Sequence, residues 1–598
     1  MQKAKLDEIV NEVVAAAHLG KDSILPEEIE YIRSHVLNKP LRVIHIWALG
    51  VGVVITGEYF GWNFGLPLGG PVGVLIASLI VCVLYLAWVL ALSELSVAMP
   101  FAGGPLAYGR RAVGKWFGFL MGWSMFLESL FATIGTALAT GGYIAFLLDP
   151  RHPSATVTTV SAVSCAVLFF IIQYQGVKEQ AVIMLWLTYA AIFVLVWFWI
   201  ACIPGVSMAR ILTQPLLLGG WAGVLGSVPY ALWWLVIIET VALASEEAHE
   251  PQVSIPRGLV LAQITLVVLV ILTWFFAVAA APYARTGAVD YPLPLVFKNV
   301  WGTGWFLAVF SALAVSGMVV SYNGMIYATS RQAFSLGRAG YLPRILGRVH
   351  PTRRTPHVSL AVWTAVVIVF ILAGRFFQSA TAVAILISTL TAIVWYILAM
   401  ACLFRLRHKE PDMFRPYKTP IYPWLPAFVA VLSAVALYLY VWVNHSVIIP
   451  TALLYLAALA WYALWARKRV LAVSPEEVAA RIAEEFAHRQ QAADPESPAG
   501  HNPAVDSEPV VVERSTGPIL MPSDPLYRRC VKAMLEKLTA PLLVAGALSL
   551  GWMILRALQV LPAMMPEKLE VTVTVALWTV LFILISFNGL FSTQRKKV

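Results

Sequence analysis

Charged residues are scarce in this chain of 598 residues. Asp, Glu, Lys and Arg make up 12% of it, whereas hydrophobic residues make up 60%. Soluble domains carry about twice that share of charge. The hydrophobic residues also come in runs of about 20, the length that crosses a bilayer as a helix. The sequence therefore predicts an all-α polytopic membrane protein.

Cysteine is also rare, and the motifs of enzymes are missing. The five cysteines have no metal-ligand spacing, so we expect them to pack within apolar runs and predict no metal or other cofactor. No HExxH metal pair and no nucleophile–base constellation stands out, so the sequence does not predict an enzyme.

The formal net charge of +10 does not indicate a nucleic-acid partner, because the basic residues concentrate in alternate loops. These loops are at residues 110–115, 331–354, 405–409, 467–469 and 595–597. Such an asymmetry is typical of the cytoplasmic side of membrane proteins. It predicts a multi-pass protein of the cell inner (plasma) membrane with both termini in the cytoplasm.

Twelve apolar spans form the predicted core. They cover residues 41–66, 71–98, 114–147, 155–175, 180–203, 221–246, 258–282, 303–333, 357–373, 380–404, 422–443 and 447–466. Spans one to five and six to ten are predicted to be two halves, and since five is odd, the second half enters the membrane inverted relative to the first. Internal similarity is weak, so this 5+5 inverted repeat rests on the span count and on acids in spans one and six.

The chain is accordingly divided into four parts. Residues 1–40 are a cytoplasmic N-terminal segment. Residues 41–466 are the twelve-helix core, with repeat one at 41–203, repeat two at 221–404, and helices eleven and twelve at 422–466. Residues 467–537 are predicted to be a cytoplasmic amphipathic helix and a disordered linker. Residues 538–598 add two further transmembrane helices and a cytoplasmic tail, which either dock on the core or contact another subunit.

Three carboxylates lie in the middle of spans. Glu58 follows the glycine-rich stretch of span one, Glu239 lies in span six, and Glu128 lies in span three. Buried charge in lipid costs roughly 3 kcal/mol or more, so such residues are usually functional. Few Lys or Arg residues lie at mid-depth to pair with them, which favours a cationic substrate, protons, or both. Neutralisation by protonation or helix–helix hydrogen bonding is the structural alternative, and it is strongest for Glu128.

Aromatic residues accompany these acids. Tyr59 follows Glu58, and Trp233 and Trp234 precede Glu239. Rings can cover an ammonium group by cation–π attraction and can gate a binding site. Packing or lipid contact is the alternative in a chain with 12% aromatic residues.

Three further acids lie near the predicted inner ends of spans. Glu94 is near the end of span two, and Glu246 and Glu247 follow span six. We expect them to form structural ion pairs that link loops, rather than to bind a ligand.

Three motifs stand in order at the ends of predicted helices. They are Glu94-Leu95-Ser96 with Pro100, Gly103-Gly104-Pro105 and Tyr108; residues 245–251 with Ile255-Pro256-Arg257; and residues 330–343 with Thr355-Pro356. Over residues 40–466 the chain thus resembles the amino acid–polyamine–organocation permeases. Within that family, residues 56–63 and Glu239 look most like the ethanolamine permease branch.

The resemblance implies the leucine-transporter fold, in which a bundle of helices one, two, six and seven rocks against a scaffold of helices three, four, eight and nine. It also implies a substrate between the broken parts of helices one and six, with Thr56 and Gly57 contributing hydrogen bonds. In amino-acid-selective relatives, backbone N–H groups at the helix-one break bind the substrate carboxylate. Glu58, directly after Gly57, opposes a carboxylate and suits an amine without one, such as ethanolamine.

Two departures from the family pattern matter. The break of helix six usually carries Gly where this chain has Thr240, which leaves the geometry of that break open. Some family members use a lysine in helix five for proton coupling, and residues 180–203 contain none. The coupling ion, H⁺ or Na⁺, is therefore left open.

The expected function is secondary active import of a small organic amine, ethanolamine first, by alternating access. Glu58 and Glu239 would hold the ammonium group, and Glu128 would line the site. The alternative is a general or cationic amino-acid permease, and a lower-ranked one is an amine-sensing membrane receptor. The expected partners are the substrate, the coupling ion and the lipid bilayer, and the oligomeric state stays open.

Overall fold

The computed structural model describes residues 41–471, except 100–102, 176–177, 246–247, 249–250, 351–352, 354, 378 and 414. The predicted segment 1–40, the chain beyond residue 471 with its two additional helices, and the acids Glu246 and Glu247 lie outside the described residues. The chain divides into two compact units, and nearly all described residues belong to the larger one, Ser34–Phe404 with Asp412–Ala472.

The described part of the chain is helical, with no strand beyond an isolated bridge between Leu41 and Ala248. Within these residues, nine helices are long and apolar enough to cross a membrane. They are α5 (Leu66–Ala98), α7 (Lys115–Leu148), α8 (Ala155–Gln175), α9 (Lys178–Cys202), α13 (Pro251–Ala280), α16 (Trp305–Arg338), α17 (His357–Gly374), α18 (Ala380–Lys409) and α20 (His445–Leu464).

The shorter apolar helix α19 (Trp424–Val443) completes the counterparts of predicted spans two to five and seven to twelve. The predicted all-α polytopic class is thereby confirmed for the described residues. The 5+5 inverted repeat and the total of fourteen spans stay predictions.

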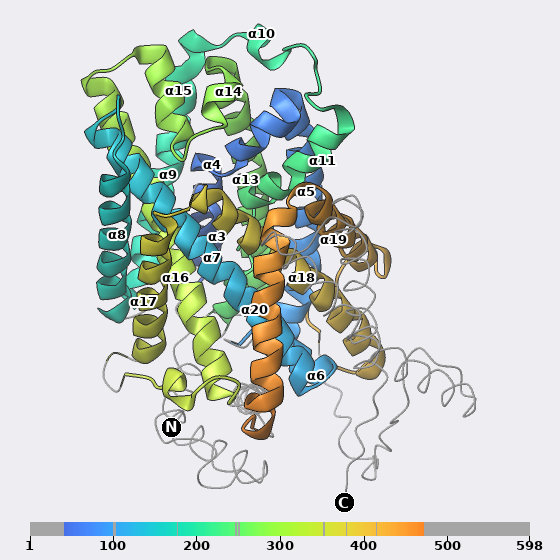
Figure 1. The fold of residues 1–598 in the computed structure, drawn as a ribbon. Coiled ribbons are helices and arrows are strands. Elements are labelled where there is room, and N and C mark those ends of the chain that lie inside the picture. The colour runs from blue at the N-terminus through green and yellow to red at the C-terminus, as the bar shows by residue number, and fades with distance from the viewer. Residues whose placement is uncertain are drawn as a thin grey trace, which may run out of the picture. The chain divides into compact units, whose positions relative to one another are not determined.

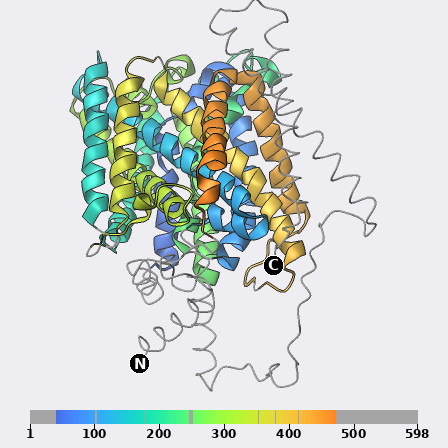
Figure 2. The same cartoon turned by 60° about the horizontal axis from the view of Figure 1, so that its bottom comes forward.

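Short helices cap the two ends of this helical unit. At the top of Figure 1 lie α10 (Met208–Ile211), α14 (Tyr283–Thr286) and α15 (Pro292–Trp301), and at the bottom lies α6 (Pro105–Ala112). The 3-10 helices η2 (Ile203–Gly205), η5 (Arg344–Gly347) and η6 (Ala466–Lys468) extend or follow longer helices. The long helix α7 runs obliquely between the two ends (Figure 1). Helices α8 and α17 pack side by side at one flank, and α19 lies at the other (Figure 2).

The first predicted span is broken. Helix α3 (Val43–Val54) is followed by the single turn α4 (Thr56–Tyr59) and by the 3-10 helix η1 (Trp62–Gly65). Between α4 and η1, Phe60 is extended and Gly61 has a φ of 97°. Because this left-handed conformation favours glycine, the glycine-rich sequence permits the break.

Helix α16 satisfies the backbone groups that the first break frees. The Thr56 N–H donates to Ser321 Oγ at 2.9 Å, and Ser321 Oγ donates to the Gly52 carbonyl at 2.7 Å. The Thr56 hydroxyl donates to the Gly317 carbonyl at 3.2 Å. In a bilayer each unsatisfied backbone group costs several kcal/mol. These bonds therefore stabilise the break and attach it to α16.

The sixth predicted span is also broken. Helix α11 (Gly220–Ala231) and η3 (Leu232–Trp234) are followed by an irregular stretch, and α12 (Thr240–Leu243) resumes the helix. The chain turns at Ile237, whose φ is 73°. This conformation costs a β-branched residue about 1–3 kcal/mol. The absence of glycine at Thr240 does not prevent the break, because the turn is made before Thr240.

The connection between α14 and α15 packs on the end of the first broken helix. Asn63 Nδ2 donates to the carbonyls of Thr286 and Val289 at 2.8 and 2.9 Å. The neighbouring Asp290 is partly buried and accepts a hydrogen bond from the Thr381 hydroxyl at 3.3 Å. Burial raises the pKa of Asp290 to about 6, and the hydrogen bond from Thr381 acts in the opposite direction.

Replacing Ser321 by Ala removes the partner of the Thr56 N–H and of the Gly52 carbonyl. We expect a stability loss of about 1–3 kcal/mol, because both groups are buried. The measurement is the thermal unfolding midpoint of the purified protein in detergent. Ser316→Ala on the same helix is the matched control, since that exposed hydroxyl bonds within its own helix to the Leu313 carbonyl. Equal losses in the two variants would contradict the role given to Ser321.

The raised pKa of Asp290 makes its ionised form unfavourable in the folded protein. The stability that the neutral Asp290 carboxyl contributes to the folded protein is fully present below the ordinary pKa of Asp. It is lost as the pH rises through about 6. At about pH 8, Asp290→Asn is expected to be more stable than the wild type by about 1–3 kcal/mol, with no gain at about pH 4. Thermal unfolding at both pH values measures the difference.

Asp149→Asn is a control of opposite sign. The backbone N–H groups of Arg151 and His152 donate to Asp149 Oδ1 at 2.9 and 3.1 Å and lower the pKa of Asp149. The stabilisation of the folded protein by ionised Asp149 is present above the ordinary pKa of Asp and is lost as the pH falls. Asp149→Asn is therefore expected to lose stability at the higher pH. An Asp290→Asn variant that gains nothing there would show that the ionised Asp290 is not unfavourable.

Candidate functional site

The two broken segments meet face to face. A Cβ on Gly57 would lie 2.6 Å from the carbonyl oxygen of Trp233 and 2.8 Å from that of Trp234. A Cβ on Gly61 would lie 2.3 Å from an atom of the Trp233 ring. Real side chains do not approach so closely, so the glycines of the first break allow it to pack directly against the second.

Aromatic rings fill the space beside this crossing. Trp62 stacks on Trp234 with ring centroids 4.7 Å apart, and Phe60 meets Trp233 edge-on at 5.5 Å. The indole Nε1 of Trp234 donates to Ser78 Oγ at 2.9 Å. Trp233 and Trp234 thus pack where the two breaks cross, and their gating role stays a prediction.

Two of the three mid-span acids come together. Glu128 on α7 and Glu239 in the helix-six break bond to adjacent residues of α18, and we name these two residues the carboxyl pair. From α18, Trp395 Nε1 donates to Glu128 Oε2 at 2.6 Å and the Tyr396 hydroxyl donates to Glu239 Oε1 at 2.7 Å. At most 1% of either acid is exposed. In this conformation the pair is closed to solvent.

Each acid of the carboxyl pair keeps one oxygen without a hydrogen-bond partner. These atoms are Glu128 Oε1 and Glu239 Oε2. The buried Trp88 Nε1 lies near the Glu239 carboxyl without reaching hydrogen-bond geometry, and the Thr240 hydroxyl also has no partner. Buried polar atoms are rarely left unpaired. The arrangement therefore has hydrogen-bonding capacity that its own side chains do not use.

Glu58 has a different set of neighbours. Its carboxyl lies near the Thr273 hydroxyl on α13, and neither of its oxygens has a hydrogen-bond partner. Glu58 is fully buried. Among the described residues, no Lys, Arg or His forms an ion pair with Glu58 or with the carboxyl pair. Glu128 and Glu239 are both held by α18, whereas Glu58 lies near α13.

Thr56 and Tyr59 hold the first break in place. Thr56 bonds to α16 through both its N–H and its hydroxyl. The Tyr59 hydroxyl donates to the Ala191 carbonyl at 2.8 Å, and its ring lies against Gly317, where a Cβ would collide with it. The Tyr143 hydroxyl donates to the Tyr59 carbonyl at 2.6 Å. The substrate contacts expected of Thr56 and Tyr59 stay predictions.

Trp395 and Tyr396 are site residues that the sequence reasoning does not single out. They stand in the middle of span ten, in a run of apolar residues where aromatic rings usually pack. The available signal is chemical, because a buried indole N–H and a buried phenol O–H both need acceptors. Carboxylates at the same depth of other spans are natural acceptors for them.

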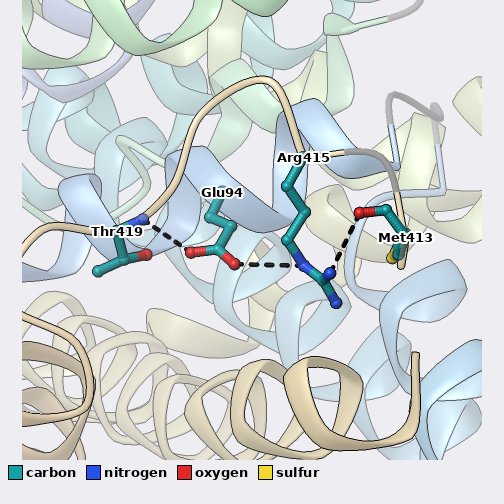
Figure 3. Close-up of polar contacts among 4 residues, drawn as sticks. All are labelled: Glu94, Met413, Arg415 and Thr419. Carbon is teal, nitrogen blue, oxygen red and sulfur yellow. Dashed lines mark hydrogen bonds and ion pairs between the residues drawn. The ribbon is translucent and has the colours of Figure 1, made fainter. Parts of the chain in front are cut away.

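A buried ion pair ties α5 to the segment that precedes α19. Arg415 Nε lies 3.4 Å from Glu94 Oε1, and the Thr419 N–H donates to Glu94 Oε2 at 2.7 Å (Figure 3). Arg415 also donates to the Met413 carbonyl at 3.2 Å (Figure 3). Burial, with a smaller contribution from the Glu94 charge, raises the pKa of Tyr417 to about 12. The predicted structural ion pair of Glu94 is confirmed.

These features define a class of protein. The chain is a polytopic membrane protein in which two discontinuous helices cross close to buried acids, the arrangement that forms substrate and ion sites in secondary transporters. Within the described residues, no group of three or more His, Cys, Asp or Glu side chains is placed to hold a metal ion.

The chain belongs to the amino acid permease family, whose model matches residues 41–464. It is 28% identical to an uncharacterized transporter of Rhizobium meliloti (strain 1021), over 71% of this chain and 91% of that protein. It is 25% identical to the branched-chain amino acid permease BcaP of Bacillus subtilis (strain 168), over 72% and 94%. It is 26% identical to the methylthioribose transporter of the same strain, over 66% and 87%. The family expected from the three motifs is confirmed, and the ethanolamine branch stays a prediction.

Gly57→Ala tests the contact between the two breaks. The added methyl group would collide with two backbone carbonyls, which cannot move aside as a flexible side chain can. We expect a loss of about 1–3 kcal/mol and a lower thermal unfolding midpoint. Gly304→Ala is the control, because no atom lies within 4 Å of its Cβ and its backbone is extended. A midpoint unchanged by Gly57→Ala would show that the breaks do not pack this closely.

Proposed function

We propose that this chain is a secondary active transporter that imports a small organic amine, ethanolamine first, by alternating access. The observation that carries the proposal is the carboxyl pair, Glu128 and Glu239, buried without a basic partner among the described residues. Burying unpaired carboxylates is costly. A substrate ammonium supplies the missing positive charge, and its attraction to the pair is strengthened by the low dielectric of the site.

The rings beside the carboxyl pair suit an ammonium ligand. Trp88 packs against Trp395 and Tyr396 with ring centroids 4.9 and 4.1 Å apart. The hydroxyls of Tyr85 and Tyr396 lie 3.0 Å apart. A cation over the face of such a ring gains about 2 kcal/mol when it is desolvated. Charge and ring contacts together favour a compact organic cation over a neutral solute.

The break of helix one is poorly suited to a substrate carboxylate. The Thr56 N–H is bonded to Ser321, and the Glu58 N–H is bonded to the Ile55 carbonyl at 3.0 Å. The Glu58 side chain also places a carboxyl group at the break. Its ionised form would repel a second carboxylate. This favours an amine that lacks one.

Helix packing supports movement by alternating access. Contacts are extensive among α3, α5, α11 and α13, and again among α7, α8, α16 and α17. The first group contains the broken helices, so it corresponds to the expected bundle, and the second corresponds to the expected scaffold. Since all three mid-span acids are buried, one group has to shift relative to the other before a substrate can reach them.

A general or cationic amino-acid permease is the second candidate. It is favoured by the similarity to the branched-chain amino acid permease of Bacillus subtilis. Such a substrate would need N–H donors for its carboxylate. The N–H groups of Thr56 and Glu58 would supply them only if their bonds to Ser321 and Ile55 opened.

Uptake of labelled ethanolamine into proteoliposomes that contain the full chain tests the substrate. The wild type is expected to concentrate ethanolamine, with competition by small amines and little by leucine. Glu239→Gln keeps the side-chain shape and removes the charge, so we expect uptake to fall about tenfold or more, equivalent to about 1.4 kcal/mol.

Asp412→Asn is the matched control, because that carboxyl is exposed and lies outside the helices. Its uptake should equal that of the wild type. Concentrative uptake of an amino acid without any uptake of ethanolamine would overturn the proposed substrate.

A further inference from the structure

A group of exposed cations lies where the chain leaves α16 and α20. We name it the basic surface, and its members are Arg344 and Arg348 at η5 and Arg467, Lys468 and Arg469 at η6. The chain contains no Asp or Glu from Tyr291 to Lys409 or from Met413 to Pro475. Neither stretch therefore offers an acid of its own. Arg348 and the three cations at η6 form no ion pair with another described residue.

Hydrogen bonds fix the end of α20 on the connection that follows α16. The indole Nε1 of Trp461 donates to the Tyr341 carbonyl at 2.8 Å, and the Leu471 N–H donates to the Ala339 carbonyl at 3.2 Å. One of these bonds comes before η6 in the sequence and the other comes after it. They therefore hold the three cations at η6 in a set place beside the end of α16.

The helices η5 and η6 both pack at the end of α16. A Cβ on Gly337 would lie 2.8 Å from the backbone N of Gly347, and a Cβ on Gly340 would lie 2.5 Å from the carbonyl oxygen of Arg469. Gly337 and Gly340 are about one helical turn apart in the sequence. Because one packs against the end of η5 and the other against the end of η6, the cations of both helices belong to one surface that the backbone shapes.

Exposed apolar side chains lie beside these cations. Leu464 at the end of α20 is 77% exposed, and Ile345 in η5 is 52% exposed. The rings of Trp461 and Trp465 lie 4.6 Å apart, and the Arg469 guanidinium lies 4.3 Å from the centre of the Trp465 ring. Tryptophan is enriched where acyl chains meet headgroups. Apolar residues, tryptophans and cations together match that boundary of a bilayer.

We propose that the basic surface binds the phosphate headgroup of one anionic phospholipid, whose acyl chains lie along the exposed side of α20. Guanidinium and ammonium groups bind phosphate oxygens through charge-assisted hydrogen bonds. A polybasic cluster beside a membrane-spanning helix attracts anionic lipids, and each cation adds to the attraction. The headgroup joins η5 to η6 and so ties the connection after α16 to α20. This inference does not depend on the transport function proposed above.

A lipid suits this surface better than a soluble phosphate does. Helix α20 is among the helices that are long and apolar enough to cross a membrane, so lipid lies along it in a bilayer. Headgroups are then present beside the basic surface at a high effective concentration. A soluble phosphate would meet the same cations but would leave the neighbouring Leu464 and Ile345 uncovered.

Native mass spectrometry of the purified full chain, titrated with phosphatidylglycerol, tests the site by resolving individual bound lipids. The wild type is expected to bind the first phosphatidylglycerol more tightly than phosphatidylcholine. The triple variant Arg467→Gln, Lys468→Gln, Arg469→Gln should raise the Kd of that first phosphatidylglycerol about tenfold or more. Its affinity for phosphatidylcholine should not change. Equal affinities of the wild type for the two lipids would overturn the proposal.

A second triple variant, Arg151→Gln, Arg285→Gln, Arg375→Gln, is the matched control. It removes the same charge from exposed residues in connections at the opposite end of the helical unit. It should bind phosphatidylglycerol like the wild type. An equal loss of affinity in both triple variants would show that net charge alone attracts the lipid, and the site would be withdrawn.

Arg348→Gln tests the part of η5 and keeps the proposal testable if the η6 variant does not fold. Phosphatidylglycerol should raise the thermal unfolding midpoint of the wild type by several degrees, and by less in Arg348→Gln. An unchanged effect of the lipid would contradict a headgroup that joins η5 to η6.

Glycerol 3-phosphate distinguishes the lipid from a soluble phosphate. Added in excess, it should not displace the first bound phosphatidylglycerol, because it has no acyl chains to lie along α20. Displacement would identify the basic surface as a site for a soluble phosphate and would overturn the lipid as its occupant.

Discussion

The crossing of the two broken helices is buried, and each polar group there has to find its partner inside the protein. At the first break, Ser321 accepts from the Thr56 N–H and donates to the Gly52 carbonyl. At the second break, no glycine relieves the turn, and Ile237 takes a left-handed conformation. The first break persists because α16 bonds to its free backbone groups, so α16 is as necessary to this crossing as the broken helices themselves.

The same constraint separates the three buried acids into two kinds. The carboxyl pair has donors from α18 on one side and open oxygens on the other. Glu58 has no bonded donor and lies near Thr273 of α13. An ammonium held by Glu58 and Glu239 together, as the sequence suggests, is one arrangement, and the structure adds Glu128 as the immediate neighbour of Glu239.

Much of the fold was predictable because its signals are local. Apolar runs predict the spans, glycines predict the break near Gly61, and loop motifs predict the family, which the family match confirms. The break near Ile237 was predictable only through the family resemblance, since a β-branched residue there argues against a turn. The pairing of Glu128 with Glu239 and their bonds to Trp395 and Tyr396 join three helices that are distant in the sequence, and no periodicity encodes such contacts. The part of the chain outside the described residues, with its two predicted helices, remains a prediction from apolar runs alone.

The ion pair between Glu94 and Arg415 couples any movement of α5 to the segment before α19. Both groups are almost completely buried, and removing one partner from such a pair costs about 3–5 kcal/mol. Helix α19 also packs on α5 and α11. A displacement of α5 that kept this pair intact would carry α19 with it as one rigid piece. The mobile body of the molecule would then be larger than the four helices of the bundle, and lipid would have to flow around α19 in every turnover.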